Sequence, residues 1–91
     1  MNKQDVVAAV ARRSGISKAS ADDAVGAVFG AITDALRKGE DVRLVGFGTF
    51  STRRRAARPG RNPRTGETIQ IPASTQPKFK PGRPLKDAVN G

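Results

Sequence analysis

The sequence predicts one α+β domain of two N-terminal helices, three strands and a short closing helix. Three observations predict this class. Apolar residues recur every three or four positions up to residue 36, residues 42–44 alternate in polarity, and a turn-rich, arginine-rich segment at 53–72 separates two strand-like stretches. We therefore expect a three-stranded antiparallel sheet that carries an extended β-ribbon arm.

Capping residues delimit the two N-terminal helices. Asn2 is a favourable N-cap, and Asp5 places a carboxylate where the helix dipole favours it. Gly15 ends this first helix, and Ser17 caps the second. Gly39 is placed to close the second helix in the left-handed conformation. The second helix has one apolar stripe, formed by Ala21, Val25, Val28, Phe29, Ile32 and Leu36.

Short strands follow the helices. Residues 42–44 alternate in polarity, and Gly46–Phe50 forms a glycine-flanked turn into a longer strand that continues through the arginines. Residues 60–66 are dense in turn formers, and Thr68–Ile71 favours a returning strand. A last strand-like stretch spans residues 77–80, and the nearby prolines predict an edge position for it.

Charge divides the single expected domain, residues 1–91, into two parts. Residues 1–45 hold seven basic and six acidic residues, a net charge of +1, and should form a helical dimerisation base with the first strand. Residues 46–91 hold ten basic and two acidic residues, a net charge of +8, and close with a helix opened by Pro84. The arginines concentrate in the arm, about residues 53–72. Because like charges at this spacing repel one another, we expect an anionic partner there.

The composition excludes several classes of protein. The 91 residues carry a net charge of +9 and include no Cys, His, Trp or Tyr. Thiolate and imidazole metal sites, disulfides and Ser-His-Asp or Cys-His nucleophiles are therefore excluded, and we expect no metal, no cofactor and no catalytic residue. No apolar run approaches the ~20 residues that span a bilayer, so no membrane partner is expected. Met1–Asp5 lacks an apolar signal segment, which predicts a cytoplasmic protein.

The chain has few large apolar residues with which to form a hydrophobic core by itself. Arg53–Thr68 contains almost nothing that can be buried, which leaves about 75 residues, near the size at which one core rarely supplies more than ~3–5 kcal/mol. Phe47, Phe50 and Phe79 can form a monomer core or a seam between two chains. We expect the shared seam, and hence a dimer.

An exposed two-stranded ribbon is marginal in water, so an arginine-rich ribbon needs a partner. Guanidinium groups along it suit a phosphate backbone. At its tip, Pro63 is either a plain turn former or a rigid apolar wedge of the kind that separates base steps from the minor groove. Asn62 and Arg64 beside it would meet only the degenerate minor-groove pattern, mainly A·T against G·C.

A long and specific pattern is formed by Gly46–Phe50, Arg55, Arg58 and Gly60–Glu67. It resembles the signature of the bacterial HU/IHF family of histone-like DNA-binding proteins, and the similarity extends over essentially the whole chain. The resemblance implies an intertwined homodimer whose helices form a base, whose strands form a saddle and whose arms wrap the minor groove. Ile69–Ser74 and Lys86–Asn90 look more like HU than IHF, which implies DNA binding with little sequence preference.

The resemblance also implies roles by position. Pro63 would be the intercalating tip, on an arm lined by Arg53, Arg55, Arg58, Arg61, Asn62 and Arg64. Body contacts with bent DNA would come from Lys3, Lys80, Arg83 and Lys86, and Phe47, Phe50 and Phe79 match the family's dimer core. The implied function is that of a nucleoid-associated protein that wraps, bends and compacts double-stranded DNA. It would prefer bent, nicked or distorted duplex, as a homodimer or with a related chain.

Three other functions stay open at this point. Val45–Phe50 faintly resembles the aromatic strand of an RNA-recognition domain, but the chain has only four Phe with which to stack bases. The helices around Gly15 suggest a helix-turn-helix reader, but phosphates would repel Asp22 and Asp23 near the start of its second helix. An enzyme based on Asp, Glu and Lys is conceivable, although no pocket-forming cluster of them is visible.

Overall fold

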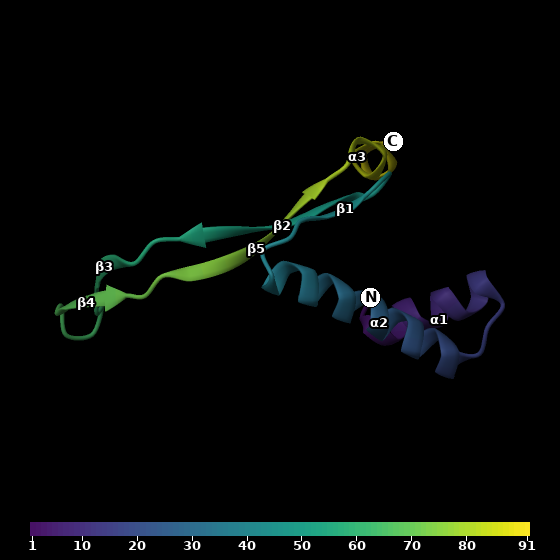
Figure 1. Cartoon of the computed structure of the whole chain (residues 1–91), viewed down its shortest axis with the longest axis horizontal. Helices are drawn as coiled ribbons and strands as arrows, with labels where there is room; N and C mark the ends of the chain where they lie inside the picture. Colours follow the sequence, from purple (N-terminus) through teal and green to yellow (C-terminus); the bar gives the residue numbers. More distant parts are fainter.

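Two helices, α1 (Lys3–Ser14) and α2 (Lys18–Arg37), pack together at one end of the computed structural model, which describes residues 1–91 (Figure 1). The predicted caps are confirmed. The Asn2 side chain accepts a hydrogen bond from the Asp5 N–H at 3.1 Å, and the Asp5 carboxylate accepts one from the Asn2 N–H at 2.9 Å. Ser17 Oγ accepts from the Ser20 N–H at 3.1 Å. Local sequence therefore determines where both helices begin.

Gly39 turns the chain from α2 into the sheet. Its φ of 79° lies in the left-handed region, as predicted. Its N–H donates to the Leu36 carbonyl at 3.0 Å, and the Glu40 N–H donates to the Ala35 carbonyl at 2.9 Å. These two bonds satisfy carbonyl groups that the end of a helix leaves without partners.

The predicted three-stranded antiparallel sheet is confirmed. Its strands are β1 (Val42–Leu44), β2 (Gly48–Arg55) and β5 (Ser74–Pro81), in the order β1-β2-β5. The last strand is longer than the expected 77–80, because it pairs residue for residue with all of β2. The short helix α3 (Arg83–Asn90) follows β5 and ends the chain.

The arm continues from this sheet as a ribbon of β3 (Arg58–Arg61) and β4 (Thr68–Ile71) (Figure 1). We predicted one strand running through the arginines, but the pairing is interrupted at residues 56–57 and 72–73. The register is the same on both sides of the gap, and it would place Pro72 opposite residue 57. Since proline has no N–H to donate, the ladder breaks there and resumes nearer the tip.

The core of one chain is small. Only four of the 91 residues are buried, and the three hydrophobic ones are Val7, Ala21 and Val25, where α1 meets α2. The apolar stripe of α2 is only partly covered, since Val28 is 54% and Phe29 47% exposed. The helix pair, the sheet and α3 therefore share no common interior within one chain.

We expect Gly48→Ala to lower the free energy of unfolding by about 1–3 kcal/mol, the usual effect of overpacking. A Cβ at this position would lie 2.6 Å from Cζ of Phe79 and 2.7 Å from the Lys80 carbonyl oxygen. The matched control is Gly30→Ala on α2, where a Cβ meets nothing within 4 Å and should stabilise the helix by about 0.5–1 kcal/mol. Urea denaturation at equal protein concentrations measures both changes, and equal shifts for the two variants would contradict this account.

Candidate nucleic-acid interface

Cross-strand pairing gathers basic side chains on one face of the sheet. Directly opposed residues share a face and alternate residues along a strand return to it. Thr49 pairs with both Arg43 and Lys80, so all three lie on this face. The following pairs on it are Ser51–Lys78, Arg53–Gln76 and Arg55–Ser74. We call this the cationic face; its basic residues, all exposed, are Arg43, Arg53, Arg55, Lys78 and Lys80.

Arg53, Arg55 and Lys80 are expected from the sequence as DNA contacts, but Arg43 and Lys78, which share their face, are not among the expected residues. Both of the latter are brought to the cationic face by the antiparallel register. Lys78 lies two residues before Lys80, so period-two counting along the last strand would have found it. The face on which Arg43 lies can be predicted only from the pairing of β1 with β2, and no local sequence pattern gives that pairing.

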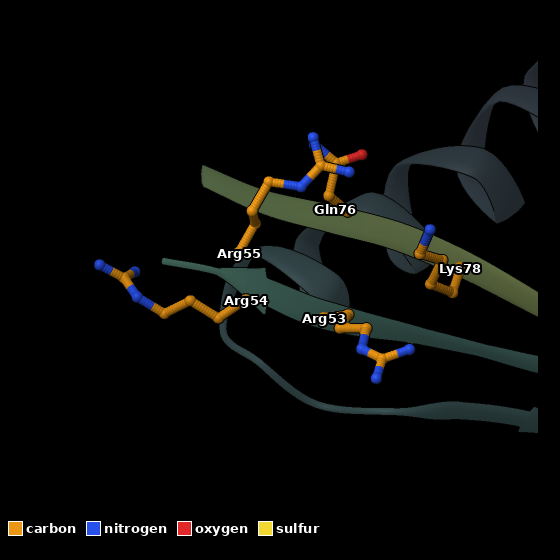
Figure 2. A pocket seen from close by; sticks show the side chains of 5 residues that line it. All are labelled: Arg53, Arg54, Arg55, Gln76 and Lys78. Atoms are coloured by element: carbon orange, nitrogen blue, oxygen red, sulfur yellow. The ribbon is translucent and has the colours of Figure 1, made fainter. Parts of the chain in front are cut away.

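A shallow hollow lies beside the arginines of β2 and is lined by Arg53, Arg54, Arg55, Gln76 and Lys78 (Figure 2). The Arg55 side chain lies toward Gln76, whereas the Arg54 side chain extends away from both (Figure 2). Arginines two residues apart on one strand are separated by about 6.6 Å, close to the rise of about 6.8 Å along the helix axis over two phosphates of one strand of duplex DNA. This spacing suits repeated guanidinium–phosphate contacts.

The opposite face of the sheet carries the aromatic cluster. Phe50 and Phe79 are paired across β2 and β5, with ring centroids 4.7 Å apart, and Phe47 lies 5.5 Å from Phe79. The structure thus brings together all three residues of the expected dimer seam. Phe47 remains 46% and Phe79 41% exposed, so the cluster is open on one side.

A six-residue turn, 62–67, forms the tip of the arm. The Asn62 N–H donates to the Glu67 carbonyl at 2.8 Å, and the Gly66 N–H donates to the Asn62 carbonyl at 2.7 Å. Asn62 Oδ1 also accepts from the Arg64 N–H at 2.9 Å. The Asn62 side chain therefore shapes the turn through its oxygen and leaves its amide N–H groups free, while Pro63 is exposed between these anchors.

The two arginines of β3 do not continue one row. Arg58 pairs with Ile71 and Arg61 pairs with Thr68, and a separation of three residues puts them on opposite faces of the ribbon. Gly60 shares the face of Arg58, and a Cβ there would lie 2.6 Å from Cδ1 of Ile71. The arm therefore carries positive charge on both faces, rather than a single line of cations.

The remaining predicted DNA contacts lie on the body. Lys3 begins α1, whereas Arg83 and Lys86 lie on α3, and these helices are well separated within one chain (Figure 1). The only ion pair of the structure joins Arg83 to Asp87, with 3.9 Å between Nε and Oδ2, and both side chains are exposed. An exposed pair of this kind contributes little. Nearly all of the positive charge is therefore without an internal counter-ion.

The structure brings together no three carboxylates that could hold a metal ion. None of its helices combines the length and apolar character required to cross a bilayer.

Known proteins resemble this chain over nearly its full length. The family described as bacterial DNA-binding protein matches residues 1–90. DNA-binding protein HU of Geobacillus stearothermophilus is 62% identical over 89 residues, covering 98% of this chain and 99% of the relative. DNA-binding protein HU 1 of Bacillus subtilis (strain 168) is 56% identical over 91 residues, covering 100% of this chain and 99% of the relative.

A solved structure resembles the chain in the same way. The Anabaena HU–DNA cocrystal structure superposes with a TM-score of 0.91 at 43% identity, covering 98% of this chain and 97% of that one. The family match, the sequence identities and the shared fold agree with the cationic face and the exposed arm described above. The chain belongs to the bacterial DNA-binding protein family, whose members among its relatives include the HU proteins.

Proposed function

We propose that this chain is a histone-like protein of the bacterial nucleoid that binds double-stranded DNA with little sequence preference and bends it. The observation that carries the proposal is the cationic face, five exposed basic residues at strand spacing with no carboxylate paired to them. The Anabaena HU with a similar fold was crystallised with DNA. Phosphate contacts of this kind position a duplex without reading its sequence.

The arm, about residues 53–72, supplies the bending in this proposal. Pro63 lies exposed at the tip between hydrogen bonds that fix the turn on either side. A proline presents an apolar ring and no N–H to desolvate, and minor-groove architectural proteins, HU and IHF among them, use such wedges to unstack base steps. Arg58 and Arg61, on opposite faces of the ribbon, can contact the two phosphate strands that border one groove.

The protein acts as a binding module and not as a catalyst in this proposal. Titratable side chains lie exposed along the sheet, arm and helices, and the structure has no buried polar side-chain atom without a partner. Catalysis relies on enclosed sites that exclude water and perturb such groups. An open cationic surface suits an extended polyanion instead.

The proposed binding unit is an intertwined homodimer. One chain exposes 7392 Å², whereas a folded monomer of its mass exposes about 5,100 Å². Its radius of gyration is 18.6 Å, against about 12 Å for a compact chain of this length. The half-open cluster of Phe47, Phe50 and Phe79 and the uncovered stripe of α2 are the surfaces that a second copy would cover.

Sedimentation at micromolar concentration should therefore show a dimer. Phe79→Ala should shift the equilibrium toward monomer and unfolded chain, because truncating a core Phe costs about 3–5 kcal/mol. Ile69→Ala is the matched control, since Ile69 is also half-exposed but lies on the arm. A folded wild-type monomer at this concentration would disprove the dimer.

Affinity for duplex DNA should fall linearly with salt concentration on logarithmic axes, with a slope of about −0.9 per phosphate neutralised. Arg55→Gln should reduce the slope by about 0.9 and weaken binding about eightfold at roughly 0.1 M salt, by the same extent on unrelated duplexes. Arg12→Gln removes the same charge from the last turn of α1, remote from the arm, and should change neither. Titrations at several salt concentrations measure both quantities, and a salt-independent affinity would refute the electrostatic mechanism.

Pro63→Ala should reduce DNA bending more than it reduces affinity. In this proposal the proline ring unstacks base steps, which costs a few kcal/mol for each step and kinks the duplex, whereas the phosphate contacts supply the affinity. Energy transfer between dyes at the two duplex ends reports the bend, and competition between nicked and intact duplex reports the preference for distorted DNA. Pro59→Ala on β3 is the control, because it also removes an exposed arm proline but not the one at the tip. Equal losses of bending and affinity for Pro63→Ala would make Pro63 a positioning residue only.

A further inference from the structure

One uncharged residue lies among the cations at the root of the arm. The hollow beside β2 is lined by four basic residues and by Gln76, the only one of the five whose side chain has an acceptor oxygen. The four basic residues are exposed, whereas Gln76 is half-buried, as is Ser74 on the same face. Gln76 is therefore the least exposed residue of the hollow.

A hydrogen bond orients the Gln76 amide. Its Nε2 donates to Ser74 Oγ at 3.3 Å, and Ser74 is the residue paired with Arg55 across the two strands. The amide oxygen, Oε1, accepts no hydrogen bond within the chain. The hollow therefore holds one unused acceptor among side chains that can only donate.

Arg55 is the cation best placed to use this acceptor. It is the diagonal neighbour of Gln76 on the cationic face, and diagonal neighbours lie about 7–8 Å apart, within reach of a long side chain. The Arg55 side chain lies toward Gln76 (Figure 2). Arg53 is directly opposite Gln76, but its side chain extends away from the amide (Figure 2).

A neutral acceptor suits a cation that must bind phosphate. No carboxylate pairs with the cations of the hollow, because the only ion pair of the structure is on α3. A carboxylate in this place would orient a guanidinium and also cancel its charge, whereas an amide oxygen orients it and leaves the charge intact. A guanidinium has five N–H donors, so it can donate to an amide and to a phosphate at the same time.

We propose that Gln76 is a positioning residue for DNA binding: its Oε1 accepts a hydrogen bond from the Arg55 guanidinium and holds that group against a phosphate. The inference rests on the DNA binding proposed above, and Gln76 is not among the expected DNA contacts. The residue acts through Arg55 and contributes no charge of its own.

A double-mutant cycle on DNA affinity tests this role. Gln76→Leu removes the acceptor at similar size and should weaken binding about two- to tenfold, the range for one hydrogen bond. The salt slope should stay unchanged, because the number of phosphates neutralised is the same. With Arg55→Gln already present, Gln76→Leu should have no further effect, whereas with Arg53→Gln, the matched control, it should keep its full effect. Titrations of one labelled duplex at several salt concentrations measure each variant.

Gln76→Glu should change the salt dependence instead. Its carboxylate should pair with the Arg55 guanidinium and neutralise it. The slope should therefore fall by about 0.9, and binding should weaken about eightfold at roughly 0.1 M salt, as for Arg55→Gln. An unchanged slope for Gln76→Glu would overturn the pairing of these two side chains.

The outcomes separate the positioning role from the proposed function. If wild-type protein fails to bind duplex DNA, the proposed function itself fails. If wild-type protein binds and Gln76→Leu binds equally well, the positioning role is overturned and the proposed function stands. The role is also overturned if Gln76→Leu has the same effect with and without Arg55, or if its effect disappears in both arginine backgrounds. Equal circular dichroism and urea midpoints show that the variants remain folded.

Discussion

One antiparallel register organises the molecule from the sheet to the end of the arm. The same offset pairs Gly48 with Pro81 at the body and Arg61 with Thr68 near the tip. Because side chains alternate along a strand, this single register puts Arg53 and Arg55 on the face opposite the Phe cluster and Arg54 on the same face as the cluster. A shift by one residue would place cations against the aromatic rings. The chemistry of both faces therefore depends on keeping this pairing.

The same arrangement leaves each chain unable to enclose a core by itself. The helix pair buries little beyond Val7, Ala21 and Val25, and the arm contributes charge rather than buried area. So short a chain cannot easily form both an extended cationic surface and a compact monomer, because residues in the arm do not contribute to the hydrophobic core. If a second copy covers the aromatic cluster, folding, assembly and presentation of the arms are thermodynamically linked.

Local signals explain what the sequence predicts well. Asn2, Ser17 and Gly39 fix helix ends through hydrogen bonds to residues only a few positions away, and the structure confirms all three. The break in the arm and the faces of Arg54 and Lys78 were not predicted. They depend on which residues meet across separations of 15 to 27 positions (72 − 57 = 15 at the break, 78 − 51 = 27 at Lys78), and a strand pattern read alone does not give its partner's offset. Once the register is known, each of these features follows.

The tip shows how one short turn divides its tasks among adjacent residues. The side-chain oxygen of Asn62 accepts a hydrogen bond from the Arg64 N–H, and the backbone of Asn62 closes the turn through hydrogen bonds with Gly66 and Glu67. Those bonds hold the turn, and Pro63 lies exposed between them. The arm has no core of its own to keep the tip in shape, since its two strands pack mainly against each other. The hydrogen bonds within the turn therefore define the shape of the tip at which Pro63 lies exposed.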